Sequence, residues 1–520
     1  MARRTQDHLH RLVRSMTAAE KRYYKTNVAR QVSEGSEALH NRLFDAIGAM
    51  EHYDEALILE RFKDTSIAHH FPITKRRLYE SVLRYLSSYH LEGSIDAKLH
   101  RGLHQVEVLH GRTLYDDAAK VLHGIKRLAT EHQRFVVLQA VMEWERKLVE
   151  CNNYTQLDSQ ALQRMTDESE RILEQQRTLN TLWDLKSNVF LQLYQEGRVR
   201  DDQDCDALRQ LLQHPLLQQA ELLTGAHARF LFHHIHGAAA FSMGDVPRCM
   251  EQLEKNLDLL NNERHLFKGD PNLIISVLSN LIYVCVQAGR YARASDLLKR
   301  FRTIPSEWDM PETEDLELKL FSTTTSLELS IHLRTGETEL ALELVPVVVR
   351  GLERHEQRIS PLRKAAFHYQ LAYVHFCCGR YEEALHWTNL LLTSGRSVEK
   401  SDAMLYGRYL YLVLLLESGK HDLLAFAMRN TERLLKVSAP HHYGNALLSL
   451  LKGLLRARSA DSRHGAFEEF AARIRAFRSD PREQAIFDHF DPLAWAESHL
   501  QGGSFAARIK QRSASVDKAA

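Results

Sequence analysis

The sequence has little of what β-rich folds and membrane spans require. Its 520 residues include only 23 glycines and 11 prolines, too few for a fold with many tight turns. No run of about 18 apolar residues occurs, so we expect no membrane-spanning helix. The basic start Met-Ala-Arg-Arg is not followed by an apolar stretch, and we therefore expect no signal peptide.

The chain also lacks an excess of charge of either sign. Its 68 lysines and arginines balance 67 aspartates and glutamates, so the formal net charge is +1. There is no global basic field that would attract nucleic acid or a membrane surface. Six cysteines are spread along the chain without a C-x-x-C pair, which is typical of reduced thiols. Together these features predict a cytoplasmic protein.

Sequence motifs of the common catalytic and cofactor sites are missing as well. The chain contains no phosphate-binding loop, no H-E-x-x-H pair and no G-x-S-x-G turn. The acidic pair Asp116-Asp117 lies at a predicted helix start, where it complements the helix dipole. We therefore expect no enzyme, no catalytic residues and no cofactor.

What the sequence does contain is a repeated helix–turn–helix pattern. Its clearest copy is Gly379–Leu385, with the sequence GRYEEAL, between apolar-periodic runs at 371–378 and 385–392. Glycine permits the left-handed turn that ends one helix, and Tyr381 opens the next. The small residue Ala384 lets the two helices approach closely.

The same pattern recurs at intervals of 45, 47, 43 and 40 residues. The turn glycines are Gly244, Gly289, Gly336, Gly379 and Gly419. Five positions after them stand the small or apolar residues Cys249, Ala294, Ala341, Ala384 and Leu424. Weaker copies at 113–118 and 152–157 keep the aromatic residue but replace the glycine. We therefore predict an array of antiparallel helix pairs that are stable only when stacked.

The Gly-x-Tyr-x-x-Ala-Leu signature resembles tetratricopeptide repeats. Leu371-Ala372 also falls where that family's first helix carries its Leu-Gly/Ala pair. The period of 40–47 residues departs from the family's roughly 34, and most copies lack its tryptophan and terminal proline. The N-terminal stretch TAAEKRYYK is similar to the start of large bacterial proteins of this type, a resemblance that implies no activity.

This resemblance implies an all-α fold, an α-solenoid whose first helices line a concave groove for a peptide or helix of a partner protein. Carried over by distance from the turn glycine, the expected partner-binding residues are Asn280, Tyr283, Gln287, Tyr369, Gln370, Tyr373, Tyr406 and Tyr409. Tyrosines and amides suit a protein-binding face. Because the repeats are long, some of these positions are equally compatible with the core.

Residues 66–90 have features of a helix-turn-helix motif. A short helix around Ile67–Phe71 is followed by a break at Pro72 and by a second helix capped at Thr74. The spacing of apolar residues fits the motif, but proline stands where glycine is expected. A structural cap is therefore the favoured interpretation of this segment.

Three basic residues, Lys75, Arg76 and Arg77, lie in the first turn of that second helix. In the alternative interpretation they contact nucleic acid, and the chain is a transcription regulator with a repeat sensor domain. Over residues 1–90 there are 15 lysines and arginines against 11 aspartates and glutamates. This surplus is mild for a DNA-binding domain.

Histidines gather on one predicted helix, where metal binding is the alternative to a partly exposed helical face. His233 and His236 are three residues apart and so share one side of the helix. No carboxylate or cysteine joins them at helical spacing, and Arg229 would repel a cation. We therefore expect no metal site at His227–His236.

The predicted organisation has three parts. Residues 1–95 form a helical module, residues 96–500 form the repeat array and residues 501–520 form a disordered tail. A helix at about 483–500 caps the array. The favoured function is a non-enzymatic scaffold or adaptor.

Overall fold

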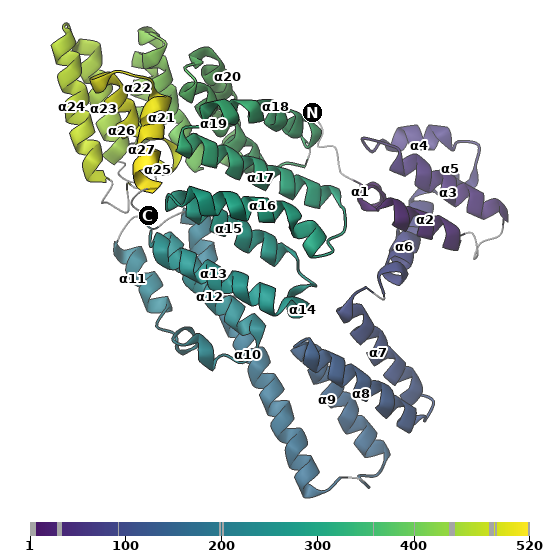
Figure 1. Ribbon diagram of the computed structural model, residues 1–520. Helices are drawn as coiled ribbons and strands as arrows, with labels where there is room; N and C mark the ends of the chain where they lie inside the picture. The colour runs from purple at the N-terminus through teal and green to yellow at the C-terminus, as the bar shows by residue number, and fades with distance from the viewer. Residues whose placement is uncertain are drawn as a thin grey trace. The chain divides into compact units, whose positions relative to one another are not determined.

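A computed structural model describes residues 7–28, 34–91, 93–155, 157–196, 202–356, 358–399, 401–435, 442–477 and 486–517, with the single residues 199 and 483. Within these ranges the fold is all-α, and no strand occurs. Figure 1 shows the helices in chain order. None of the helices in the described ranges combines the length and apolar character that a membrane span needs.

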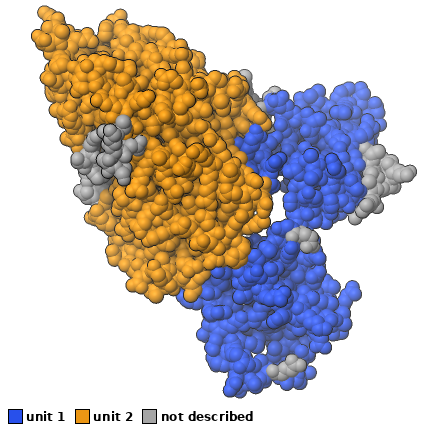
Figure 2. All heavy atoms as spheres, viewed as in Figure 1, with its two compact units in different colours: residues 1–177, 311–317 blue, residues 178–310, 318–520 orange. Residues whose placement is uncertain are grey.

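The chain divides into two compact units, residues 1–177 with 311–317 and residues 178–310 with 318–520 (Figure 2). Helix α10 (Ser159–Glu196) contributes to both. The other helices of the first unit are α1 (His8–Ser15), α2 (Ala18–Val28), α3 (Glu34–Gly48), α4 (Glu55–Arg61), α5 (Ser66–His69), α6 (Phe71–His90), α7 (Ile95–His110), α8 (Tyr115–Glu131) and α9 (Phe135–Cys151).

The second unit continues the chain with helices that pack against their sequence neighbours. They are α11 (Asp202–Leu211), α12 (Ala226–Ser242), α13 (Val246–Asn262), α14 (Arg264–Phe267), α15 (Asn272–Gln287), α16 (Tyr291–Glu307), α17 (Glu314–Thr335), α18 (Thr338–Arg354), α19 (Pro361–Cys377), α20 (Tyr381–Leu392), α21 (Asp402–Glu417), α22 (His421–Leu435), α23 (His442–Arg456), α24 (Ala460–Phe477), α25 (Ile486–His489), α26 (Pro492–Gln501) and α27 (Phe505–Asp517). The first residues of α17 belong to the first unit.

The predicted turns are confirmed. The five glycines have φ angles of 78°, 72°, 75°, 70° and 66° at Gly244, Gly289, Gly336, Gly379 and Gly419. In the clearest copy the amide of Arg380 donates to the carbonyl of His375 at 2.9 Å, the long backbone bond of a Schellman helix end. The residues five positions later are all buried: Cys249, Ala294, Ala341, Ala384 and Leu424.

Equivalent turns without glycine occur too, and sequence reasoning found only some of them. Thr113 has a φ of 63° and is followed by the fully buried Ala118, as predicted. Gln133 has a φ of 53°, and the next amide, of Arg134, donates to Ala129 at 2.8 Å. Asp309 likewise has a φ of 48°. The turns at Gln133 and Asp309 were missed because neither residue signals a helix end.

Helices α1–α6 surround a hydrophobic core of their own, which includes Tyr24, Phe44 and Val82. A capping box is present at the start of α2: the amide of Thr17 donates to Glu20 Oε2 at 2.6 Å, and the amide of Glu20 donates to Thr17 Oγ1 at 3.3 Å.

The helix-turn-helix boundaries differ from the prediction. Helix α6 begins at Phe71, so Pro72 lies in its first turn rather than in a break, and Thr74 is not its cap. Proline is compatible with the first turn because the amide there has no helical partner. The preceding helix α5 has only 4 residues.

The C-terminal prediction is wrong in two respects. The expected capping helix is interrupted at Phe490–Asp491, because Pro492 starts the separate helix α26. The expected disordered tail contains helix α27, in which Phe505 and Ile509 are buried in the hydrophobic core of the second unit.

The turn glycine can be tested with Gly379→Ala. A Cβ at Gly379 meets no atom within 4 Å, so the substitution creates no steric clash. Its only effect is the backbone strain of a residue with a side chain at a φ of +70°. We expect it to lower the free energy of unfolding by about 1 kcal/mol. Gly465→Ala is the matched control, because a Cβ there is equally unobstructed and the residue lies inside α24. It should raise stability by about 0.5–1 kcal/mol. Equal effects in urea denaturation would contradict the prediction.

Candidate functional site

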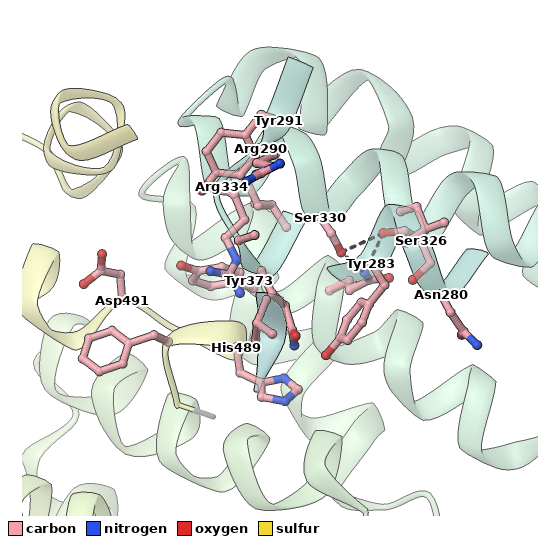
Figure 3. Close-up of a pocket in the computed structure, with 18 of the residues that line it drawn as sticks. Asn280, Tyr283, Arg290, Tyr291, Ser326, Ser330, Arg334, Tyr373, His489 and Asp491 are labelled. Carbon is pink, nitrogen blue, oxygen red and sulfur yellow. Dashed lines mark hydrogen bonds between the residues drawn. The ribbon is translucent and has the colours of Figure 1, made fainter. Parts of the chain in front are cut away.

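A cleft with a volume of about 960 Å³ lies within the second unit. Its walls come from α15, α17 and α19, with contributions from the starts of α13 and α16 and from α25 and α27. Figure 3 shows Asn280 and Tyr283 of α15 towards one end of the cleft and Asp491 towards the other. The cleft is thus bordered by the first helices of successive pairs.

Helical periodicity places the lining residues. Asn280, Tyr283 and Gln287 are three and four residues apart, so they share one face of α15. Ser326 and Ser330 share a face of α17 in the same way. Thus α15 turns amide and aromatic groups towards the cleft, and α17 turns hydroxyl groups towards it.

Gln370 ties α19 to α17 at the wall of the cleft. Its Nε2 donates to the carbonyl of Ser326 at 3.0 Å and to Ser330 Oγ at 3.2 Å. Its Oε1 is buried and has no hydrogen-bond partner in the described part of the chain. Gln370 is therefore first of all a structural link between neighbouring helices.

Residues 486–517, the C-terminal segment, cover part of the surface that the repeat resemblance assigned to a partner. Tyr369 Oη donates to the carbonyl of His489 at 2.9 Å, and the His489 ring stacks on Tyr406 with ring centroids 4.2 Å apart. Phe505 packs against Tyr373 at 6.2 Å and Phe376 at 5.1 Å. The chain itself occupies this part of the surface.

The predicted partner-binding residues fall into three groups: exposed or half-buried residues that line the cleft, buried residues that line it, and buried residues outside it. Asn280 and Tyr283 are exposed, and together with Gln287, Tyr369, Gln370 and Tyr373 they line the cleft. Tyr369 and Tyr373 are nevertheless only 5% and 8% exposed, and burial raises the pKa of both phenols well above its usual range.

Tyr406 and Tyr409 are not among the lining residues. They are 8% and 3% exposed, Tyr406 beneath His489 and Tyr409 against Tyr443 at 5.3 Å. Their assignment to a partner-binding surface is wrong for this state of the chain, because intramolecular aromatic contacts bury them.

The charge of the cleft is predominantly positive. Among the described residues that line it, the charged ones are Arg290, Arg334, Arg363, Arg512 and Asp491. The only carboxylate, that of Asp491, lies 3.4 Å from Arg512 Nη1, which is also 3.6 Å from Glu497. Sequence reasoning missed these arginines because each stands at a helix end or on a different helix.

Neither the protein-family models nor the curated proteins give a match to this sequence. The role of the cleft must therefore be inferred from its own side chains and their contacts.

The basic residues of the nucleic-acid alternative have different environments. Lys75 Nζ lies 2.6 Å from Asp7 Oδ2 and 3.1 Å from Glu55 Oε2, and its side chain is only 22% exposed. Arg76 pairs with Glu80 at 2.8 Å on the surface of α6, and Arg77 is exposed. Lys75 is thus held by ion pairs to residues of helices α1–α6 and their connections, whereas Arg76 and Arg77 are exposed to solvent.

The expected partly exposed face of α12 is present at His227, His233 and His234, which are half-buried, whereas His236 is buried. His236 is 6% exposed and its Nε2 lies 3.0 Å from the carbonyl of Leu217. His233 Nδ1 lies 2.8 Å from Gln252 Oε1. Within the described residues no three histidine, cysteine or acidic side chains are placed to hold one metal ion.

The C-terminal segment should contribute strongly to stability. Phe505 is 9% exposed and packs on Phe376 and Phe490. We expect Phe505→Ala to lower the free energy of unfolding by about 3 kcal/mol, because it leaves a cavity in the core. Phe426→Ala is the matched control, since Phe426 is 59% exposed and should cost less than about 0.5 kcal/mol. If urea denaturation gave the same loss for both, the segment would not be docked as described.

Two histidines, the half-buried His234 and the buried His368, predict a loss of stability in acid. Burial, aided by Lys186 for His234 and by Lys364 and His386 for His368, lowers the pKa of each from 6.5 to about 4. The folded-state pKa is below the unfolded one, so the unfolded chain binds more protons between about pH 6.5 and pH 4. Stability that is present above pH 6.5 is therefore lost as the pH falls through this window.

The variant His368→Phe tests this assignment. It removes the titrating group together with Nδ1, which is buried without a hydrogen-bond partner in the described part of the chain. Between pH 7 and pH 4 this variant should lose about 2–3 kcal/mol less unfolding free energy than the parent. His464→Phe, at a side chain 51% exposed, is the control and should follow the parent profile. Parallel profiles for His368→Phe and the parent would refute the assignment.

Proposed function

We propose that this chain is a non-enzymatic protein-interaction scaffold with a tetratricopeptide-like, solenoid array of helix pairs. The open cleft of the second unit receives a segment of a partner protein. The observation that carries the proposal is the gathering of six independently predicted groove residues, from α15 and α19, around one cleft. The local repeat pattern alone selected these positions, and they come from helices far apart in the sequence.

The composition of the cleft supports a peptide or helix as its ligand. Tyr283 and Tyr291 offer large contact areas at low entropic cost, and Asn280 and Gln287 offer amide groups that suit a peptide backbone. Among the described lining residues, the titratable ones other than tyrosine and arginine are His489 and Asp491, and Asp491 is already paired with Arg512.

A transcription regulator that binds DNA through residues 66–90 is the competing proposal. Its support is the exposure of Arg76 and Arg77 on α6. Against it, Lys75 is engaged by Asp7 and Glu55, and Arg76 is neutralised by Glu80. The concentrated basic surface that DNA binding needs is therefore reduced to a few groups.

The test is affinity capture from native lysate with full-length chains. The parent is compared with Asn280→Ala/Tyr283→Ala, which truncates exposed cleft residues, and with Arg76→Glu/Arg77→Glu. Phe426→Ala is the control for loss of an exposed aromatic ring outside the cleft. We expect partner proteins that resist nuclease treatment and that the cleft variant binds at least about tenfold more weakly.

Equal capture by the parent and the cleft variant would contradict the proposal. Nucleic acid captured by the parent and lost from Arg76→Glu/Arg77→Glu would favour the regulator instead. Thermal unfolding of each variant distinguishes a lost contact from a lost fold.

A further inference from the structure

The charge of the open cleft points to the chemistry of its ligand. Arg290 at the start of α16 and Arg363 in the first turn of α19 both line the cleft and are exposed. Neither side chain forms an ion pair or a side-chain hydrogen bond within the described chain. Arg334, near the end of α17, adds a third positive charge from another helix (Figure 3).

The carboxylate inside the cleft already forms an ion pair with an arginine. Asp491 is the one acidic residue among the described lining residues, and Arg512 and Glu497 complete its ion-pair group. Arg290 and Arg363 therefore line the cleft without a compensating carboxylate from the described chain. The protein around Arg363 displaces enough water to lower the pKa of its guanidinium, although the side chain is still open to solvent. A partly desolvated cation attracts an incoming carboxylate more strongly than one in bulk water.

We infer that the cleft receives an acidic segment of a partner protein, whose carboxylates pair with Arg290 and Arg363. This inference rests on the proposed function and adds the partner's chemistry to it. Arginine suits the role because its planar guanidinium binds carboxylates with two parallel hydrogen bonds. In the same cleft, Tyr283, Asn280 and Gln287 provide the aromatic and amide contacts that a peptide backbone and its side chains use.

A protein ligand fits these observations better than single-stranded nucleic acid, which also favours cationic and aromatic grooves. The described lining residues include amides and hydroxyls from several helices but no lysine. The chain as a whole carries a formal net charge of only +1. A track of phosphates would need a longer basic surface than these arginines provide.

The direct test is fluorescence anisotropy with the full-length chain and a labelled peptide of about 12 residues, alternating Glu and Ala around a central Leu. We expect the peptide to bind, and Arg290→Glu and Arg363→Glu each to weaken binding about tenfold. Lys299→Glu is the matched control: this residue of α16 is 74% exposed and lies outside the cleft. It should change the affinity less than about twofold. Binding should also weaken from about 50 mM to about 200 mM salt.

Two further ligands test whether binding is specific for an acidic peptide. A peptide with Lys in place of Glu should not bind, and equal binding of the two peptides would overturn the inference. A thymidine oligonucleotide of similar length should bind more weakly than the Glu peptide. If it bound more tightly, and the two Arg→Glu variants abolished that binding, the cleft would be a nucleic-acid site instead.

The two proposals fail in distinguishable ways. Partner proteins lost from Asn280→Ala/Tyr283→Ala but retained by both Arg→Glu variants would leave the scaffold function standing and refute the acidic partner. Partner proteins retained by all of these variants would refute both. Loss from the cleft variant and from both Arg→Glu variants, with retention by Lys299→Glu, would support both.

Discussion

The left-handed turn between paired helices is the constraint on which the rest of the second unit depends. At Gly379 the chain adopts a φ of 70°, and the following amide closes the helix end by donating to His375 at 2.9 Å. The chain then reverses, and the fully buried Ala384 allows close packing of α19 on α20. A side chain with a Cβ is strained at such a φ by about 1–2 kcal/mol. Helices α15, α17 and α19 each end at one of these turns, and all three contribute residues to one cleft.

This local rule explains how much of the fold could be predicted. Glycine followed five positions later by a small residue is a signal within a few residues, and the structure confirms it at five turns. The turn at Gln133 could not be found in this way, because packing of the flanking helices holds a non-glycine residue at a φ of 53°. Pro72 was misread for a related reason: proline both breaks helices and begins them, and only tertiary structure decides which.

The candidate site could be predicted only in part. Asn280 and Tyr283 were found because helical spacing fixes the face of α15 that carries them. The burial of Tyr373 and Tyr406 could not be predicted, because the rings that contact them belong to Phe505 and His489, more than 80 residues away in the sequence. Composition misled the prediction at this point, since a tail rich in small and polar residues still contains the aromatic ring that docks.

The aromatic part of the predicted groove and the part lined by arginines differ in the free energy of burying them under another segment of protein. Around Tyr373 the surface is aromatic, so the apolar Phe505 covers it favourably and water is excluded. Arg290 and Arg363 cannot be covered in the same way, because burying an unpaired guanidinium costs several kcal/mol. Where the C-terminal segment meets the charged part of the cleft, it brings Asp491 and Arg512 as a paired set. Desolvation thus limits how far the chain can cover its own groove, and a ligand that covers the rest must itself supply negative charge.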